Sequence, residues 1–95
     1  MKPSYQIIIT KPFGKSLRKL VPKNEELAQR IQTVITKLAF DPFDTALRTH
    51  KVLSKNHNEA WSSRINGDLR IIWDFDEGNK INIYLLDIRW AFRSE

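Results

Sequence analysis

Two arginines, Arg64 and Arg70, flank the tripeptide Asn66-Gly67-Asp68, whose composition is typical of a tight turn between β-strands. Guanidinium groups are planar and always charged, and their paired N–H donors match the oxygen atoms of a phosphate. Two of them side by side would bind a phosphate and stabilise the negative charge that develops as it reacts. This chemistry depends on whether the two strands bring the arginines together.

The alternation of side chains along each strand decides the register. The strand expected at Leu69–Asp76 has an apolar core face made of Leu69, Ile71, Trp73 and Phe75, and an opposite face made of Asp68, Arg70, Ile72 and Asp74. The strand expected at Trp61–Ile65 has Trp61, Ser63 and Ile65 on one face and Ser62 and Arg64 on the other. A two-residue turn would pair Arg64 with core-facing Leu69. A three-residue turn or a bulge pairs Ile65 with Leu69, so we predict that Arg64 lies opposite Arg70.

This register places the two arginines about 5 Å apart at their Cβ atoms, on a sheet face that we expect to be open. Like charges so placed repel each other, and an anion between them would remove the repulsion. We therefore predict an anion clamp. In the alternative, a nearby carboxylate of Asp68, Asp74 or Glu59 neutralises the pair.

The two histidines are the other candidates for acid–base chemistry. His50 falls in an expected strand, which favours a structural role, and His57 falls in a polar loop, which favours simple solvation. The sequence has no metal-ligand spacing, no Gly-rich phosphate loop and no Ser/His/Asp arrangement. We therefore expect neither a metal nor a cofactor.

The elements before the hairpin are a strand and two helices. Tyr5–Thr10 is an isoleucine-rich run between prolines and predicts a strand. Pro12 and the helical spacing of Phe13, Leu17 and Leu20 predict a short helix with a basic outer face. Asn24 is a good cap for a second helix, which we expect to end at Asp41-Pro42. The apolar stripe of the second helix consists of Leu27, Ile31, Val34, Ile35 and Leu38.

The rest of the chain predicts strands at His50–Leu53, Trp61–Ile65, Leu69–Asp76 and Lys80–Ile88. The resulting order, βααββββ, indicates an α+β fold. We expect an antiparallel helix hairpin to pack on one face of a mostly antiparallel, twisted sheet.

The composition is that of one small basic domain, which we expect to span residues 1–95. The net charge is +5, and the excess lies in residues 1–40. Such a charge attracts nucleic acid, acidic partners or anionic membranes, or only keeps a surface solvated. The apolar run near the start of the chain, Ile7-Ile8-Ile9, is too short for a signal peptide or a membrane span. With no cysteine, the chain is expected to be cytoplasmic and not associated with a membrane.

The segment from Leu47 to Ile88 resembles the RelE/ParE superfamily of toxins from bacterial type II toxin–antitoxin modules. The resemblance is carried by THKVL, by WSSRINGDLRIIWDF and by IYLLDI, and the element order and chain length fit as well. The pattern H-K-L…W-S-x-R-x-x-G-D-L-R-I-I-[YW] is typical of the RelE branch, which includes messenger-RNA interferases.

The resemblance implies a toxin that enters the ribosomal A site and cuts messenger RNA without a metal, through attack of the RNA's own 2′-hydroxyl on the adjacent phosphate. It implies that Arg64 and Arg70 supply the catalytic cations. The residues implied to contact RNA are His50, Lys51, Lys55, Ser62, Arg89, Trp90 and Arg93. Ser62 departs from the family, in which a basic residue is common at this position.

The tail also departs from the family, whose members commonly follow the last strand with Gly-Thr-His-x-x-x-Tyr or an Arg/Tyr equivalent. Here Ala91 stands where the His or Arg would be, and the chain ends before a terminal Tyr. In one interpretation Arg89, Trp90 and Arg93 substitute, with Trp90 or Phe92 stacking on a base. In the other, Trp90 and Phe92 close the edge of the core and activity is weak or absent.

Two further functions stay open at this point. One is a non-enzymatic inhibitor of DNA gyrase, as in the ParE branch. The other is a weakened toxin that acts as corepressor with its antitoxin. All of these functions imply a cognate antitoxin as partner. The messenger-RNA-cutting toxin would in addition bind the ribosome and messenger RNA. Operator DNA is a further partner expected of the toxin–antitoxin complex.

Overall fold

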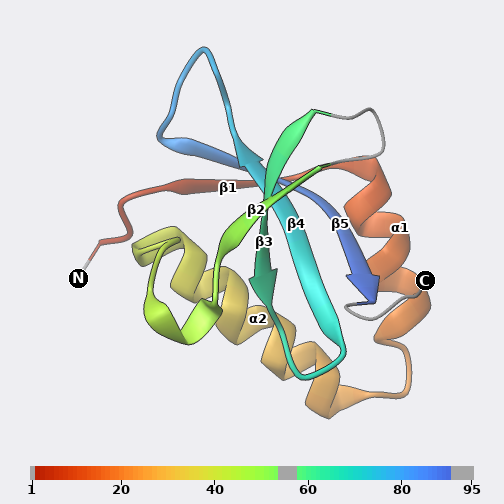
Figure 1. Cartoon of the computed structure of the whole chain (residues 1–95). Helices are drawn as coiled ribbons and strands as arrows, with labels where there is room; N and C mark the ends of the chain where they lie inside the picture. The colour runs from red at the N-terminus through yellow and green to blue at the C-terminus, as the bar shows by residue number, and fades with distance from the viewer. Residues whose placement is uncertain (1, 54–57, 91–95) are drawn as a thin grey trace.

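A computed structural model describes residues 2–53 and 58–90 of the chain. Its elements are β1 (Gln6–Ile9), α1 (Lys11–Leu20), α2 (Glu25–Phe40), a short 3₁₀ turn (Thr45–Leu47), β2 (His50–Leu53), β3 (Glu59–Arg64), β4 (Leu69–Phe75) and β5 (Asn82–Trp90). Over these residues the strands form one sheet in the order β1-β5-β4-β3-β2 (Figure 1). Only the β1–β5 pair is parallel, so the predicted α+β fold with a mostly antiparallel sheet is confirmed.

Helix α2 begins at the predicted cap, Asn24, and α1 begins at Lys11 with Pro12 in its first turn, as predicted, and with Thr10, expected in the strand, as its cap. The side-chain oxygen of Asn24 accepts a hydrogen bond from the Leu27 N–H and caps α2. Thr10 caps α1 and also donates its hydroxyl to the Leu85 carbonyl at 2.7 Å, which fastens the start of α1 to β5. Each helix packs on the sheet: α1 runs along β5, and α2 lies across one face of the sheet (Figure 1).

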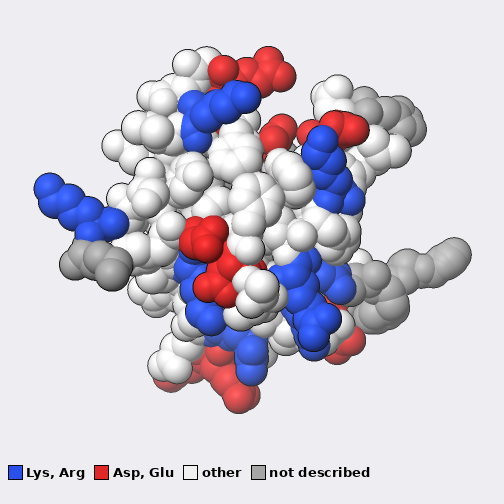
Figure 2. All heavy atoms as spheres, turned by 60° about the vertical axis from the view of Figure 1, so that its left-hand side comes forward, with Lys and Arg blue, Asp and Glu red and all other residues white. Residues whose placement is uncertain are grey.

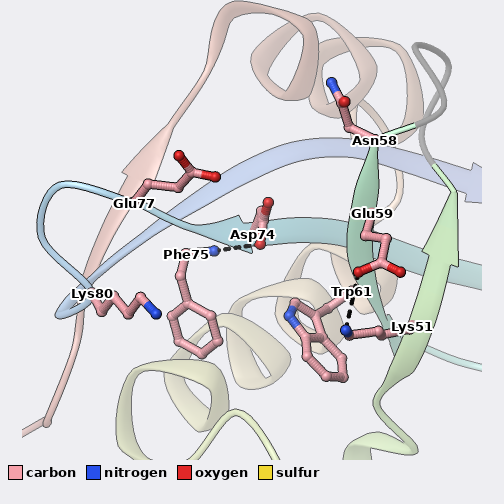
Figure 3. A pocket seen from close by; sticks show the side chains of 8 residues that line it. All are labelled: Lys51, Asn58, Glu59, Trp61, Asp74, Phe75, Glu77 and Lys80. Carbon is pink, nitrogen blue, oxygen red and sulfur yellow. Dashed lines mark hydrogen bonds and ion pairs between the residues drawn. The ribbon is translucent and has the colours of Figure 1, made fainter.

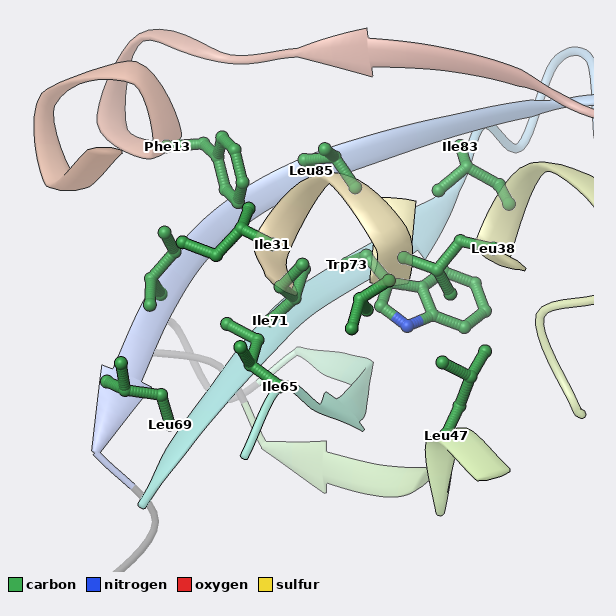
Figure 4. Close-up of a cluster of buried hydrophobic side chains, with 12 residues drawn as sticks. Phe13, Ile31, Leu38, Leu47, Ile65, Leu69, Ile71, Trp73, Ile83 and Leu85 are labelled. Carbon is green, nitrogen blue, oxygen red and sulfur yellow. The ribbon is translucent and has the colours of Figure 1, made fainter. Parts of the chain in front are cut away.

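The core lies between α2 and the sheet and is closed by α1 at one edge (Figure 4). Trp73 is fully buried at its centre, and its indole N–H donates to the hydroxyl of Ser63 at 2.8 Å. The Ser63 hydroxyl is in turn 2.7 Å from that of Thr49. The polar atoms of Trp73 and Ser63 are therefore satisfied, and the bond between them holds β3 and β4 together inside the core.

The turn between β3 and β4 has three residues, as the hydrophobic pattern predicts. The Ile65 N–H donates to the Leu69 carbonyl at 2.9 Å, and Arg64 pairs with Arg70. The side-chain oxygen of Asn66 accepts hydrogen bonds from two backbone N–H groups, those of Asp68 at 2.8 Å and Leu69 at 2.9 Å. Asn66 therefore fixes the shape of the turn and with it the register of the arginines.

We expect Asn66→Ala to lower the free energy of unfolding by about 1–2 kcal/mol, because two backbone donors of the turn lose their acceptor. Urea unfolding followed by tryptophan fluorescence measures the change. Gln32→Ala, on the exposed side of α2, is the matched control and should change stability by less than about 0.5 kcal/mol. Equal stabilities of the two variants would show that Asn66 does not hold the turn.

Strand β5 carries an irregularity that the sequence does not predict. Ile72 pairs with Asp87 whereas Trp73 pairs with Leu85, so Leu86 is an extra residue in β5. Such a β-bulge reverses the alternation of side chains beyond it. Leu85 therefore faces the core, while Asp87 and Arg89 face the same side of the sheet as Arg70.

None of the helices in the described part of the chain is long and apolar enough to cross a membrane.

Candidate functional site

Three arginines form a row across the three central strands of the sheet, at the end that carries the β3–β4 turn. Arg64 on β3 pairs with Arg70 on β4, and Arg70 pairs on its other side with Arg89 on β5. Neighbouring strands lie about 4.8 Å apart, so the row is about 10 Å long. We call Arg64, Arg70 and Arg89 the arginine row. The sequence predicts two of its members as the anion clamp, and the bulge in β5 adds the third.

The charges of the row are largely uncompensated. None of the described carboxylates lies within ion-pair distance of Arg64 or Arg70, so the predicted alternative, neutralisation by Asp68, Asp74 or Glu59, is not what this structure shows. Arg64 donates through Nε to the Asn66 carbonyl at 3.1 Å. The Nη1 atom of Arg70 is buried and has no hydrogen-bond partner among the described residues. The protein therefore leaves one charged donor of the row unsatisfied.

Arg89 differs from the other two because it has an acidic neighbour. Its Nε lies 3.8 Å from Oδ2 of Asp87, a distance that allows attraction but is too long for a hydrogen bond. Oδ1 of the same carboxylate accepts the hydroxyl of Ser16 on α1 at 2.7 Å. Neither Asp87 nor Ser16 is a predicted site residue. The only sequence signal was an aspartate within the apolar run YLLDI.

The next row of residues on the same face runs through His50, Ser62, Ile72 and Asp87. This face is less open than predicted, since Ser62 and Ile72 are 1% and 4% exposed. Both residues lie on inner strands of the sheet, which have a neighbouring strand on each side. Ser62 Oγ is buried without a hydrogen-bond partner in the described structure, and His50 is exposed with Nδ1 3.1 Å from the Arg48 carbonyl.

Two of the predicted RNA contacts lie on the other face of the sheet. Lys51 pairs with Trp61, forms an ion pair with Glu59 at 3.1 Å and stands 5.5 Å from the Trp61 ring. Trp90 pairs with Leu69, and its side chain is 58% exposed on the side that carries α2. The arginine row therefore does not include them. Lys55 and Arg93, and with them His57, Ala91 and Phe92, lie outside the described residues.

Two clefts flank the sheet near these residues. One, of about 500 Å³, lies beside the Arg89 end of the arginine row and is bordered by Asp87 and Arg89 together with the apolar side chains of Ala60, Ile72 and Leu86. The carboxylates of Glu59 and Asp74 line it as well. The other, of about 650 Å³, is drawn in Figure 3 and is lined by Lys51, Asn58, Glu59, Trp61, Asp74, Phe75, Glu77 and Lys80. Its charges are mixed and Lys51 is held by Glu59 (Figure 3). Of these two clefts, the first is the one that adjoins a member of the arginine row, Arg89.

Charge elsewhere on the surface is less concentrated. The side of the molecule at the left of Figure 1 carries both acidic and basic side chains, separated by wide uncharged areas (Figure 2). A mixed surface of this kind gives solubility and no strong field of one sign. No cluster of three or more His, Cys, Asp or Glu side chains that could hold a metal ion occurs within residues 2–53 and 58–90.

Comparisons with known proteins give matches among solved structures only; no protein-family model and no curated protein sequence matches the chain. A chain of the archaeal RelE–RelB complex from Pyrococcus horikoshii OT3 superposes with a TM-score of 0.72 at 23% identity, covering 96% of this chain and 99% of that one. The YoeB/ParE toxin from Agrobacterium tumefaciens gives a TM-score of 0.72 at 12% identity, with 92% and 99% covered. YafQ from Escherichia coli BL21(DE3) gives 0.69 at 16% identity, with 92% and 93% covered. The chain therefore has the fold of the RelE, YoeB and YafQ toxins, as its hairpin motif predicts.

Proposed function

We propose that this protein is the toxin of a type II toxin–antitoxin module and that it cuts messenger RNA on the ribosome. The observation that supports this function best is the arginine row, in which two of three guanidinium groups have no carboxylate partner among the described residues. The row lies on a sheet with the fold of RelE, YoeB and YafQ, and two of its members, Arg64 and Arg70, lie within the segment whose motif resembles the RelE branch. No cofactor enters the proposal.

The proposed reaction is attack of an RNA 2′-hydroxyl on the adjacent phosphate. The phosphorane that forms carries one more negative charge than the phosphate from which it arises. Because the row is fixed by strand pairing, its donors are in place before this charge develops. Arg64, Arg70 and Arg89 would therefore stabilise the phosphorane more than the bound substrate, which is the condition for catalysis.

The test is a cell-free translation reaction with a defined message and purified protein. We expect fragments of the message to appear with 2′,3′-cyclic phosphate ends, and only while ribosomes translate it. Full-length message that survives an excess of protein would contradict the proposal. A supercoiling assay with purified gyrase is run in parallel, because inhibition of gyrase with intact message would instead identify a ParE-like inhibitor.

The proposal includes an antitoxin as partner. The structures with this fold include RelE with RelB from Pyrococcus horikoshii and YoeB with YefM from Staphylococcus aureus. We expect the partner to present an acidic, amphipathic segment to this basic chain, with apolar anchors supplying most of the affinity. Co-purification after expression of the native operon tests this, and a toxin that elutes alone from such a preparation would argue against it.

The salt dependence of RNA binding should report how many phosphate contacts the arginine row makes. For a short single-stranded RNA with a 2′-deoxy group at the cleavage site, each phosphate contact contributes about −0.7 to the slope of log K against log[salt]. We expect Arg64→Ala to make this slope less steep by about 0.7, as measured by fluorescence anisotropy. Arg18→Ala, on the exposed surface of α1, should leave it unchanged. An unchanged slope for both variants would exclude Arg64 from phosphate binding.

A further inference from the structure

We propose that Asp87 is the group that accepts the proton of the attacking 2′-hydroxyl. This inference rests on the proposed ribonuclease function and adds the acid–base residue that the tail motif does not provide. It follows from three observations: the face on which Asp87 lies, the occupation of its two oxygens, and the cleft that it borders.

The bulge in β5 places Asp87 next to the arginine row. Asp87 pairs with Ile72, and Arg89 pairs with Arg70, so the carboxylate and the guanidinium lie two residues apart on one face of β5. At about 3.3 Å per residue this separation is about 7 Å along the strand. A ribose 2′-hydroxyl and its adjacent phosphate are neighbouring groups of one nucleotide, and a nucleotide with its phosphate in the row can bring the hydroxyl to Asp87.

The two oxygens of Asp87 have different surroundings. Oδ1 accepts hydrogen bonds from the Ser16 hydroxyl at 2.7 Å and from the Ile88 N–H at 2.8 Å, which together fix the orientation of the carboxylate. Oδ2 has only the contact with Arg89 at 3.8 Å among the described residues. The side chain is 27% exposed, so Oδ2 has room to accept a hydrogen bond from a hydroxyl group.

The cleft beside Asp87 gives the nucleotide a place to bind. Its volume of about 500 Å³ lies within the range of small-molecule sites, and Asp87 and Arg89 both border it. Ala60 and Ile72 are buried there and offer an apolar surface to the sugar or base. A nucleotide in this cleft would therefore contact both the Asp87 carboxylate and the Arg89 guanidinium, which lie on the same face of β5.

The step balances without a further reactant. The proton of the 2′-hydroxyl moves to Oδ2 of Asp87 while the 2′-oxygen forms a bond to phosphorus. The bond between phosphorus and the 5′-oxygen of the next nucleotide breaks, and that oxygen takes a proton from water. The products are a 2′,3′-cyclic phosphate and a free 5′-hydroxyl, and Asp87 returns its proton to solvent.

The test compares wild type with Asp87→Asn in cleavage and in binding. Asparagine keeps an acceptor for Ser16 and for the Ile88 N–H, so the fold is preserved, but it cannot take the proton. We expect single-turnover cleavage on the ribosome to fall about 10²–10⁴-fold. Affinity for RNA with a 2′-deoxy group at the cleavage site should stay equal or rise, because a negative charge beside the phosphate is removed. Glu77→Gln, an exposed carboxylate in the β4–β5 loop, is the matched control and should cleave like wild type.

Two further variants separate proton transfer from positioning. If Asp87 acted only by holding Arg89, Asp87→Asn would have no effect in an Arg89→Ala background; we expect it to reduce cleavage further, by at least about 10²-fold. Ser16→Ala should cause a smaller loss than Asp87→Asn. An Asp87→Asn variant that cleaves message as fast as wild type would overturn the role of Asp87 but not the proposed function. The same conclusion would follow if Asp87→Asn had no effect in the Arg89→Ala background. A wild-type protein that cleaves no message would overturn the proposed function and this inference together.

Discussion

Replacing Arg70 by alanine is expected to reduce the rate of message cleavage about 10²–10³-fold, the effect of removing one donor that stabilises developing negative charge. Arg70 is the central member of the row, with Arg64 on one side and Arg89 on the other. Without it, Arg64 and Arg89 remain on either side of β4 with no guanidinium group between them. The rate is measured under single-turnover conditions on the ribosome, so that substrate binding and chemistry are resolved.

The design of this experiment uses two controls. Arg18→Ala removes an arginine from the exposed side of α1 and should leave cleavage unchanged. Arg70→Lys keeps the charge but not the planar pair of donors, so it should restore only part of the rate. Circular dichroism should show equal structure in all variants, since no ion pair or hydrogen bond of Arg70 holds the described fold together. An Arg70→Ala variant that is folded and fully active would exclude the row from catalysis.

Replacing Trp73 by alanine is expected to lower the free energy of unfolding by about 3–5 kcal/mol. Trp73 is fully buried, and its indole N–H donates to Ser63 across the β3–β4 pair. The substitution leaves a cavity between α2 and the sheet and removes one of the two hydrogen-bond partners of the Ser63 hydroxyl. For a domain with a stability of about 5–10 kcal/mol, this is a large share of the total.

Urea unfolding measured by circular dichroism tests this expectation. Leu53→Ala, on the exposed end of edge strand β2, is the control, because the Leu53 side chain is 61% exposed; it should change stability by less than about 0.5 kcal/mol. Trp73→Phe should lie between the two, since it retains most of the volume but loses the hydrogen bond. A loss below about 1 kcal/mol for Trp73→Ala would show that the core is not organised around this residue.

Much of the fold could be predicted from local patterns. Asn24 and the apolar stripe of α2 identify a helix because capping and helical spacing act within a few residues. The pairing of Arg64 with Arg70 could be predicted because strand alternation and turn length together allow only one register. The resemblance of the hairpin to RelE toxins is confirmed at the level of fold. The catalytic and RNA-binding roles of individual residues stay predictions.

The candidate site could be predicted only in part, and the missing part depends on contacts between distant segments. Strict alternation from the core residues Ile83 and Leu85 would place Asp87 and Arg89 on the core face. The bulge at Leu86 reverses this assignment, and it is seen only when β5 is aligned with β4. The bond from Ser16 to Asp87 joins residues 71 positions apart, which no local pattern specifies.

The sequence by itself determined the Arg64–Arg70 pair, because a period of two and a three-residue turn leave no other pairing that buries the apolar face. Tertiary structure alone decided that the pair becomes a row of three, that Lys51 and Trp90 lie on the opposite face, and that a carboxylate stands beside the row. For Asp87, Arg89 and Trp90 the physical reason is that the extra residue Leu86 exchanges the faces of all residues beyond it in β5, whereas the face of Lys51 follows from the pairing of β2 with β3. The free energy that selects this bulge comes from burying Leu85 and Ile88 on the same side of the sheet.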